Sequence, residues 1–334
     1  MRTAIVSGIV AALIMTVLIL GRTDPAGPSS YVVIGVSQGC VYGLVALGLV
    51  LVYKGSRVFN FAQGEFGTIA AFLVFLITEQ WNTNLPYFVA MLIAIVSVIL
   101  LGILMERVIV RPLLNAPRIS LLVASIAFAL FAVAIELVLF LPEPKVFSPF
   151  VTSLPGIPET GREILNFTLE PQRFLIVFLL AVLAGVLGYF FSRTDLGLAI
   201  LATSQDAFAT RVVGIGVERM SRFIWASAAG LGAIAGILYI PLTGALTPGA
   251  MTFSVLIPAF TAAVIGGMTS LPGAFVGGIV IGCVQSLSNW AANAWHLGDR
   301  TYQEILPGTA DVVLLVLLLV VLLARPQGLL GSEA

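Results

Sequence analysis

Residues Lys54–Leu76 read KGSRVFNFAQGEFGTIAAFLVFL, in which a polar centre, NFAQGEFG, lies between long apolar runs. Across the 334 residues of the chain, 59% are apolar and 10% are charged, and the mean hydropathy is +1.10. These values lie far outside the range of soluble domains. The sequence therefore predicts an integral membrane protein, and the polar centre of this stretch has to be accommodated in or near the bilayer.

Apolar segments long enough to cross the bilayer, about 20 residues for a hydrocarbon layer of roughly 30 Å, recur along the chain. We predict a single all-α transmembrane domain over residues 1–334, a polytopic bundle of about 8 to 10 spans. The predicted spans are 4–20, 31–53, 58–78, 86–105, 119–141, 172–192, 222–242, 253–269, 271–289 and 308–324. The spans 253–269 and 271–289 are alternatively a broken or re-entrant pair.

The charge distribution predicts the orientation of these spans, because cytoplasmic loops carry the excess of Lys and Arg. With both termini inside the cell, the inner loops hold most of the 16 basic residues, whereas the outer loops are acidic on balance. The longest outer loop is 142–171, and the longest inner loop is 193–222. The first span also has the basic start and apolar middle of a secretory signal, but no clear small-x-small cleavage site follows it, which favours a retained helix.

The polar centre of the opening stretch contains a carboxylate, Glu65. A helix that begins at Val58 places Glu65 roughly 10 Å along its length, where a charge has to be neutralised, paired or hydrated. Three interpretations remain open for Asn60, Gln63, Gly64 and Glu65. The carboxylate accepts backbone N–H groups at a helix break, it lines a translocation path, or it lies at a helix entrance near cytoplasmic water.

Two further features bear on the bundle interior. Glu136 lies six residues before Pro142 and is expected to reach the outer interface. The segment Gly266–Gly278, GGMTSLPGAFVGG, also joins two apolar runs through a short polar turn. Paired interrupted segments of this kind indicate an internal repeat with interrupted helices, although the similarity is too short to establish one.

Glycines recur at four-residue spacing in two predicted spans. Such spacing places small residues on one helix face and lets two backbones approach closely in lipid. We therefore expect these helices to be central, with intramolecular packing as the main role and a lining of the substrate path as the alternative. The residues are Gly35, Gly39, Gly43, Gly273, Gly277, Gly278 and Gly282.

The inner loop 193–222 contains an amphipathic pattern. Leu201, Phe208, Val212 and Ile215 fall on one side of a helix. The polar residues around them are mixed in sign, whereas helices that lie on lipid are usually basic. The loop is therefore predicted to dock on a protein partner.

Several function classes are excluded by what the sequence lacks. There is no GxxxxGK[ST] phosphate loop, and the single histidine, His296, lies in a predicted outer loop. A histidine-based metal site or catalytic triad therefore cannot be assembled within the chain. A passive channel, which rings of charge or a repeated filter sequence would favour, is the alternative from a different class.

Five segments, taken in order, resemble the inner-membrane permease of the branched-chain amino acid ABC importers. They are GLVALGLVLVYKGSRVFNFAQGEFG, MERVIVRPL, ATSQDAFATRVVGIGVER, FTAAVIGGMTSLPGAFVGG and LLARPQGLLG, and the resemblance extends from about Tyr31 to Gly331. As an ordered set the five are specific, whereas no one of them is specific alone.

The resemblance implies a transport subunit rather than an enzyme, in the plasma membrane of a prokaryote. Its implied partners are a second homologous permease, two cytoplasmic ATPase chains that use ATP and Mg²⁺, an external substrate-binding protein and the lipid bilayer; it implies no cofactor on this chain and no nucleic acid. Relatives of this type also handle urea and short amides, so that substrate class remains the alternative.

The resemblance also implies a coupling helix that carries ATP-driven motion into the membrane. The segment of the inner loop that would form this helix follows only loosely the general ABC permease loop pattern, which begins Glu-Ala-Ala. The alignment of individual residues with that pattern is therefore not fixed. The implied coupling residues are Asp206, Ala207, Phe208, Arg211, Gly214 and Ile215.

Overall fold

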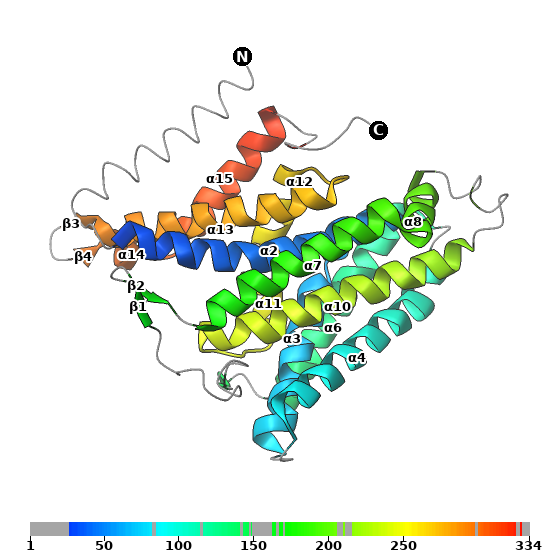
Figure 1. Ribbon diagram of the computed structural model, residues 1–334, viewed down its shortest axis with the longest axis horizontal. Helices are drawn as coiled ribbons and strands as arrows, with labels where there is room; N and C mark the ends of the chain where they lie inside the picture. The colour runs from blue at the N-terminus through cyan, green and yellow to red at the C-terminus, as the bar shows by residue number, and fades with distance from the viewer. Residues whose placement is uncertain are drawn as a thin grey trace.

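The computed structural model describes residues 27–81, 85–113, 116–140, 143–146, 148, 162–164, 167–169, 171–205, 210, 216–297, 300–324 and 328. The described residues form a helical bundle (Figure 1). The long helices are α2 (Gly27–Ser56), α3 (Gln63–Phe75), α4 (Tyr87–Met105), α6 (Arg118–Phe140), α7 (Pro171–Arg193), α10 (Val217–Thr243), α13 (Leu271–Ala294) and α15 (Thr309–Ala324). The predicted all-α polytopic fold is confirmed.

Shorter elements complete the described chain. The short helices are α5 (Arg111–Leu113), α8 (Asp195–Gln205), α11 (Ala250–Ser254), α12 (Leu256–Gly266) and α14 (Tyr302–Ile305), with π-helical turns η1 (Leu76–Gln80) and η2 (Glu106–Val110). Two antiparallel hairpins pair β1 (Arg162–Ile164) with β2 (Phe167–Leu169) and β3 (His296–Leu297) with β4 (Arg300–Thr301).

The predicted spans within the described residues overlap helices, whereas span 4–20 lies outside them. The expectation of a helix that begins at Val58 is wrong: α3 begins at Gln63, so Glu65 lies in its first turn. In the described part of the chain, 6 helices are long and apolar enough to cross a membrane, namely α2, α4 with its continuation to Leu113, α6, α7, α10 and α13. The predicted span 253–269 is broken between α11 and α12, and the 11 residues of α12 are about 16 Å long, too short to cross alone.

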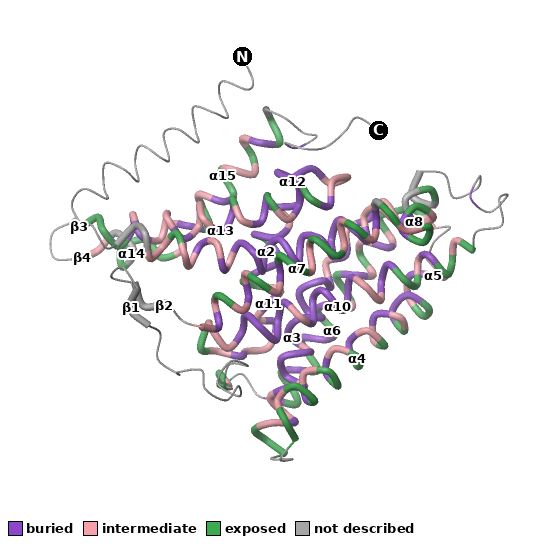
Figure 2. Tube along the Cα trace, in the orientation of Figure 1, coloured by how far each residue is buried: buried purple, intermediate pink, exposed green. Residues whose placement is uncertain are grey.

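Helices α2 and α10 form the centre of the bundle. In their most apolar windows 72% and 78% of the residues are buried, against 28% in α4 and 17% in α7. Figure 2 shows the same contrast, with buried residues on the central helices and exposed ones on α4, α7 and α15. The exposed residues of α4, α6 and α7 are mostly apolar, as surfaces that face lipid require.

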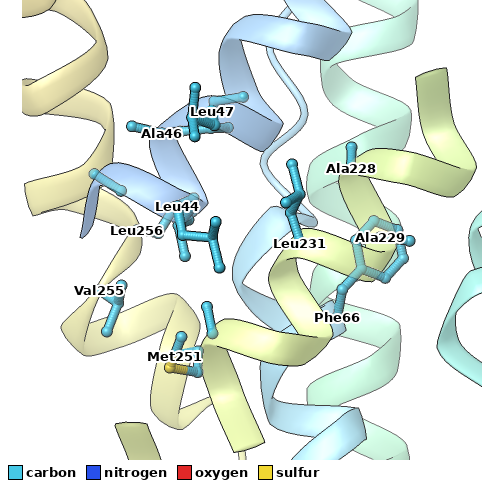
Figure 3. Packing of buried hydrophobic residues seen from close by; sticks show 14 of the residues in the cluster. Leu44, Ala46, Leu47, Phe66, Ala228, Ala229, Leu231, Met251, Val255 and Leu256 are labelled. Atoms are coloured by element: carbon cyan, nitrogen blue, oxygen red, sulfur yellow. The ribbon is translucent and has the colours of Figure 1, made fainter. Parts of the chain in front are cut away.

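The interior joins helices from both halves of the chain. Leu44 of α2, Phe66 of α3 and Leu231 of α10 are almost fully buried (Figure 3). Met251 of α11 and Val255, which lies between α11 and α12, belong to the same cluster. Helix α11 packs on α3 and α10, which also contact each other directly. At the break between α11 and α12, Val255 and Leu256 are buried, whereas Phe253 and Ile257 are 66% and 52% exposed. The break is therefore covered by protein on one side only.

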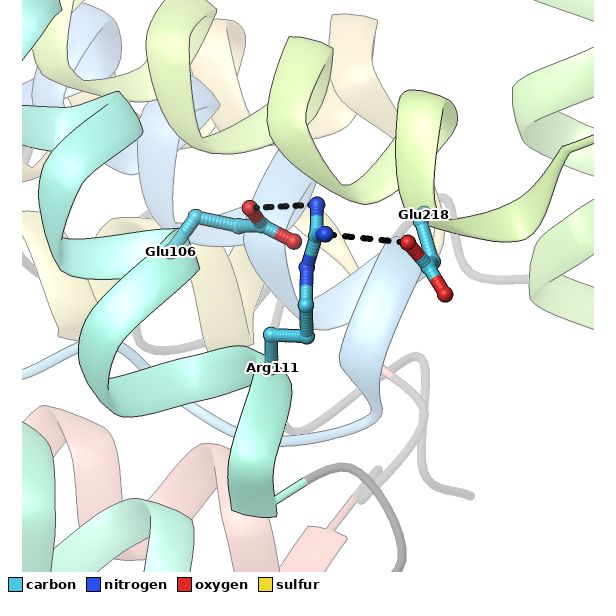
Figure 4. Close-up of polar contacts among 3 residues, drawn as sticks. All are labelled: Glu106, Arg111 and Glu218. Carbon is cyan, nitrogen blue, oxygen red and sulfur yellow. Dashed lines mark hydrogen bonds and ion pairs between the residues drawn. The ribbon is translucent and has the colours of Figure 1, made fainter.

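Two ion pairs that share Arg111 connect η2 and α5, which continue α4, to the start of α10 (Figure 4). Glu106, whose side chain is 0% exposed, pairs with Nη2 of Arg111 at 3.4 Å, and Nη1 of Arg111 pairs with Glu218 at 3.0 Å. The Glu218 side chain is 60% exposed, so its pair with Arg111 is solvated. Arg111 is therefore the cation that neutralises a fully buried carboxylate.

Replacing Arg111 with alanine is expected to lower the free energy of unfolding by about 3–5 kcal/mol, because Glu106 is left buried and unpaired. The matched change Glu218→Ala removes only a solvated partner of the same arginine and is expected to cost about 1 kcal/mol or less. Thermal unfolding of the purified variants in one detergent measures both. Equal losses of stability in the two variants would show that the unpaired, buried carboxylate of Glu106 is not the main cause of the destabilisation.

Candidate functional site

A cavity of roughly 350 Å³ lies among α2, α10, α11, α12, α13 and α15. Its volume falls in the range of about 300–1,000 Å³ that is usual for small-molecule sites. One part of its lining is polar and consists of Gln38, Tyr42, Tyr239, Ser254, Gln285, Asn289 and Asp311. The other part is apolar and includes Phe253, Ile257, Leu314 and Leu315. We call this space the polar cavity.

A chain of hydrogen bonds crosses the polar cavity. The Tyr42 hydroxyl donates to Oε1 of Gln285 at 2.6 Å, and Nε2 of Gln285 donates to Oδ1 of Asp311 at 3.2 Å. The Tyr42 ring also meets Tyr239 edge-on, with 6.5 Å between the ring centroids. The chain fixes the amide of Gln285, because its oxygen accepts from one neighbour and its nitrogen donates to the other.

Asp311 supplies the negative charge of this cavity. It lies in the first turn of α15, where the helix dipole favours a carboxylate. Asp311 is an exposed residue at the edge of the cavity, where one of its oxygens accepts a hydrogen bond from Gln285. A carboxylate beside apolar walls is suited to a small solute that carries an amino group and an aliphatic side chain. The chemistry of the cavity is therefore recognition, because none of its side chains is placed as a nucleophile beside a base.

The cavity residues were not singled out in the sequence. Gln38 and Tyr42 lie in a segment notable for its glycines, and Asp311 lies at the start of an apolar run. A signal was nevertheless present, since a Gln and an Asp inside predicted membrane spans are by default functional candidates. Their clustering depends on the fold and has no local signature.

The glycines quoted for their spacing lie where three helices cross. A side-chain carbon on Gly35 would lie 2.8 Å from Cα of Cys283, one on Gly39 2.6 Å from Cα of Ile279, and one on Gly43 2.9 Å from Phe275. Gly278 and Gly282 face α2 from the side of α13, whereas Gly273 and Gly277 face α12. No residue of this set is among those that line the polar cavity.

The four residues of the predicted helix break lie at the start of α3. Asn60 accepts a hydrogen bond from the Ala62 N–H at 3.0 Å, and Gln63 donates to the Ala228 carbonyl of α10 at 2.8 Å. Gly64 faces Thr252 of α11, where a side-chain carbon would lie 2.5 Å from the hydroxyl oxygen. In this structure Asn60 and Gln63, rather than Glu65, make the hydrogen bonds at the break.

Glu65 is fully buried, and neither of its carboxyl oxygens has a hydrogen-bond partner among the described residues. It interacts with Thr252 and Glu136. The expectation that Glu136 reaches the outer interface is wrong: Glu136 is 4% exposed, and its Oε2 accepts a hydrogen bond from the Gly249 N–H at 2.9 Å. The loop before α11 covers it, a contact that its distance from Pro142 does not reveal.

The six implied coupling residues, Asp206, Ala207, Phe208, Arg211, Gly214 and Ile215, lie outside the described residues. The structure describes the helix that precedes them, α8, which begins at Asp195 and packs against α7 and α2.

The comparison with protein families gives one match over most of the chain. Residues 31–322 match the family model for the permease component of branched-chain amino acid transport systems. No solved structure matches the chain significantly.

Curated relatives carry the same description. The chain is 32% identical to the high-affinity branched-chain amino acid transport system permease protein BraD of Pseudomonas aeruginosa, over 89% of this chain and 94% of the relative. It is 30% identical to LivH of Escherichia coli, over 89% and 93% of the two chains. A probable branched-chain amino acid transport permease of Methanocaldococcus jannaschii is 26% identical, over 87% and 88%.

Proposed function

Because the chain belongs to the family of branched-chain amino acid transport permeases, and is thus a transport subunit of multi-pass membrane type, we propose that it moves branched-chain amino acids across the membrane as part of an ATP-driven importer. The structural observation that supports this proposal is the polar cavity. Asp311 suits the ammonium group of an amino acid, and Phe253, Ile257, Leu314 and Leu315 suit an aliphatic side chain. Urea has no aliphatic part for those walls.

The cavity fits the first stage of import. In the predicted topology with both termini inside the cell, Gln38 of α2, Gln285 of α13 and Asp311 of α15 fall in the outer halves of their helices, and Tyr42 lies at the middle of α2. A solute released by an external binding protein would meet this cavity before it reached the inner half of the bundle. The proposed location is the plasma membrane of a prokaryote.

The proposed assembly consists of this chain, a second homologous permease, two cytoplasmic ATPase chains and the external binding protein. ATP and Mg²⁺ are used by the ATPase chains, and this chain holds no cofactor. ATP binding would close the ATPase pair, and the segment around residues 206–215 would carry that motion into the bundle and alternate the access of the path.

The segment gives a test of the ATPase partnership. Phe208→Asp is expected to reduce the ATPase recovered with the tagged protein several-fold, because it places a charge in an apolar contact. Asp195, on the preceding helix α8, is exposed, and Asp195→Asn is the control, expected to leave recovery unchanged. Undiminished recovery with Phe208→Asp would contradict the coupling role.

The proposed function is tested by uptake into vesicles that contain the chain and the partners recovered with it. Accumulation of labelled leucine that requires ATP, with labelled urea excluded, is the expected result. ATP-dependent accumulation of urea would move the assignment to an amide importer. Equilibration of either solute by the chain alone, without an ATPase, would show a passive channel.

A further inference from the structure

Two buried carboxyl groups lie apart from the polar cavity and have no part in the proposed path. Glu65 is in the first turn of α3, and Glu136 is on α6, four residues before its end at Phe140. We propose that Glu65 and Glu136 together bind one proton, and that this shared proton holds α3 against α6 and α11. The inference does not depend on which solute the permease carries.

The hydrogen bonds of the pair are incomplete without a proton. Both oxygens of Glu65 and Oε1 of Glu136 are buried without a partner in the described part of the chain. Glu136 and Glu65 interact directly with each other. The hydroxyl oxygen of Thr252, which lies beside Glu65, is also buried and unpartnered. Three side chains from three helices therefore converge, and of their five oxygen atoms only Oε2 of Glu136 accepts a hydrogen bond within the described residues.

One proton completes this arrangement. Ionised carboxylates only accept hydrogen bonds, so two of them cannot bond to each other, and their like charges repel at low dielectric. A proton taken from water converts one carboxylate into a hydroxyl donor, which then bonds to an oxygen of the other. The pair keeps a single negative charge, and the Gly249 N–H and the Thr252 hydroxyl can donate to it.

No cation in the described structure substitutes for the proton. Neither carboxyl interacts with a Lys, Arg or His among the described residues. Among the elements packed on α3, α11 has no titratable side chain. The others carry charged groups, and none of these is among the groups that act on Glu65 or Glu136. They are Glu218, Arg219 and Arg222 of α10, Arg118 of α6, Lys54 of α2 and Glu79 of η1. Tyr239 of α10 interacts with Tyr42, and Tyr87 of α4 interacts with Glu79. Within the same residues there is no cluster of three His, Cys, Asp or Glu that could hold a metal ion.

The surroundings also disfavour a second charge. Glu136 lines an apolar cavity of roughly 240 Å³ between α3, α4 and α6, where its neighbours include Phe72, Phe128 and Phe140. An additional ionised oxygen at this boundary would lack water and hydrogen-bond donors, which is costly. Removal of the shared proton at alkaline pH is therefore expected to separate the helices and lower stability.

The first test is infrared spectroscopy of the protein in lipid nanodiscs, which detects the carbonyl band of a protonated carboxyl group. The band is expected at neutral pH in the wild type and in Glu143→Gln, which alters an exposed carboxylate, and is expected to be lost from the double variant Glu65→Gln/Glu136→Gln. A wild type without the band, or a double variant that retains it, overturns the proposal.

The second test measures the melting temperature from about pH 7 to about pH 9. If the folded state holds a proton that the unfolded state releases, the folded protein loses stability as that proton is removed. Each single variant, Glu65→Gln or Glu136→Gln, mimics the singly protonated pair, because its amide donates to the remaining carboxylate. The alkaline decrease in melting temperature is expected in the wild type and in Glu143→Gln, and is expected to be abolished in both single variants.

Two outcomes of this second test contradict the proposal. If the single variants lose stability at alkaline pH as the wild type does, the group whose deprotonation destabilises the protein is neither Glu65 nor Glu136. The other outcome concerns salt. If sodium chloride raises the melting temperature of the wild type and choline chloride does not, and if neither single variant shows this increase, the pair binds a cation instead of a proton.

Discussion

Gly39→Val is expected to prevent stable folding of the bundle. A side-chain carbon at this position would lie 2.6 Å from Cα of Ile279 and 2.7 Å from the Gly278 carbonyl oxygen, so the backbones of α2 and α13 would have to separate. Overpacking by extra methyl groups costs about 1–3 kcal/mol where side chains can adjust, and here the obstacle is backbone. Size-exclusion chromatography is expected to recover little folded protein.

Gly185→Val is the matched control. Gly185 lies in α7, and a side-chain carbon there would meet nothing within 4 Å. The same change of residue therefore tests the position and not the loss of a glycine. Wild-type yield and melting temperature are expected for Gly185→Val, whereas the same result for Gly39→Val would show that the helices do not cross as closely as the structure has them.

This helix crossing also shows what the sequence could predict. Four-residue spacing of Gly35, Gly39 and Gly43 identifies a face that needs a close neighbour. It does not identify the neighbour, because any helix with small residues at the right spacing would fit. The structure supplies the second stripe, on α13, and shows that these glycines serve packing between α2 and α13 and are not among the lining of the polar cavity.

The polar cavity could not be predicted by the same reasoning. Tyr42 and Gln285 are hydrogen-bonded across 243 positions of the chain, so no local pattern records their contact. Glu136 was misplaced for a related reason. Distance along the helix gives depth relative to a predicted boundary, but burial depends on the Gly249 loop, which arrives from a remote part of the chain. Helix spans follow from composition, whereas the sites between helices follow from packing.

Asp311→Asn is expected to reduce leucine uptake about 10–100-fold at subsaturating substrate, because a hydrogen bond to a charged group contributes about 1.5–3 kcal/mol. The amide keeps the shape of the side chain and its contact with Gln285 but removes the charge proposed to receive the substrate ammonium group. Asp195→Asn is the control, since Asp195 also lies in the first turn of a helix and is exposed.

The measurement also separates recognition from folding. Leucine and 4-methylpentanoate, which has the same aliphatic part without the amino group, are compared as competitors of labelled leucine uptake. If Asp311 receives the ammonium group, the wild type prefers leucine strongly, and Asp311→Asn loses most of that preference while keeping its melting temperature. A variant that retains the preference would show that Asp311 does not receive the ammonium group, and recognition would then rest on the other polar residues of the cavity or on another chain of the assembly.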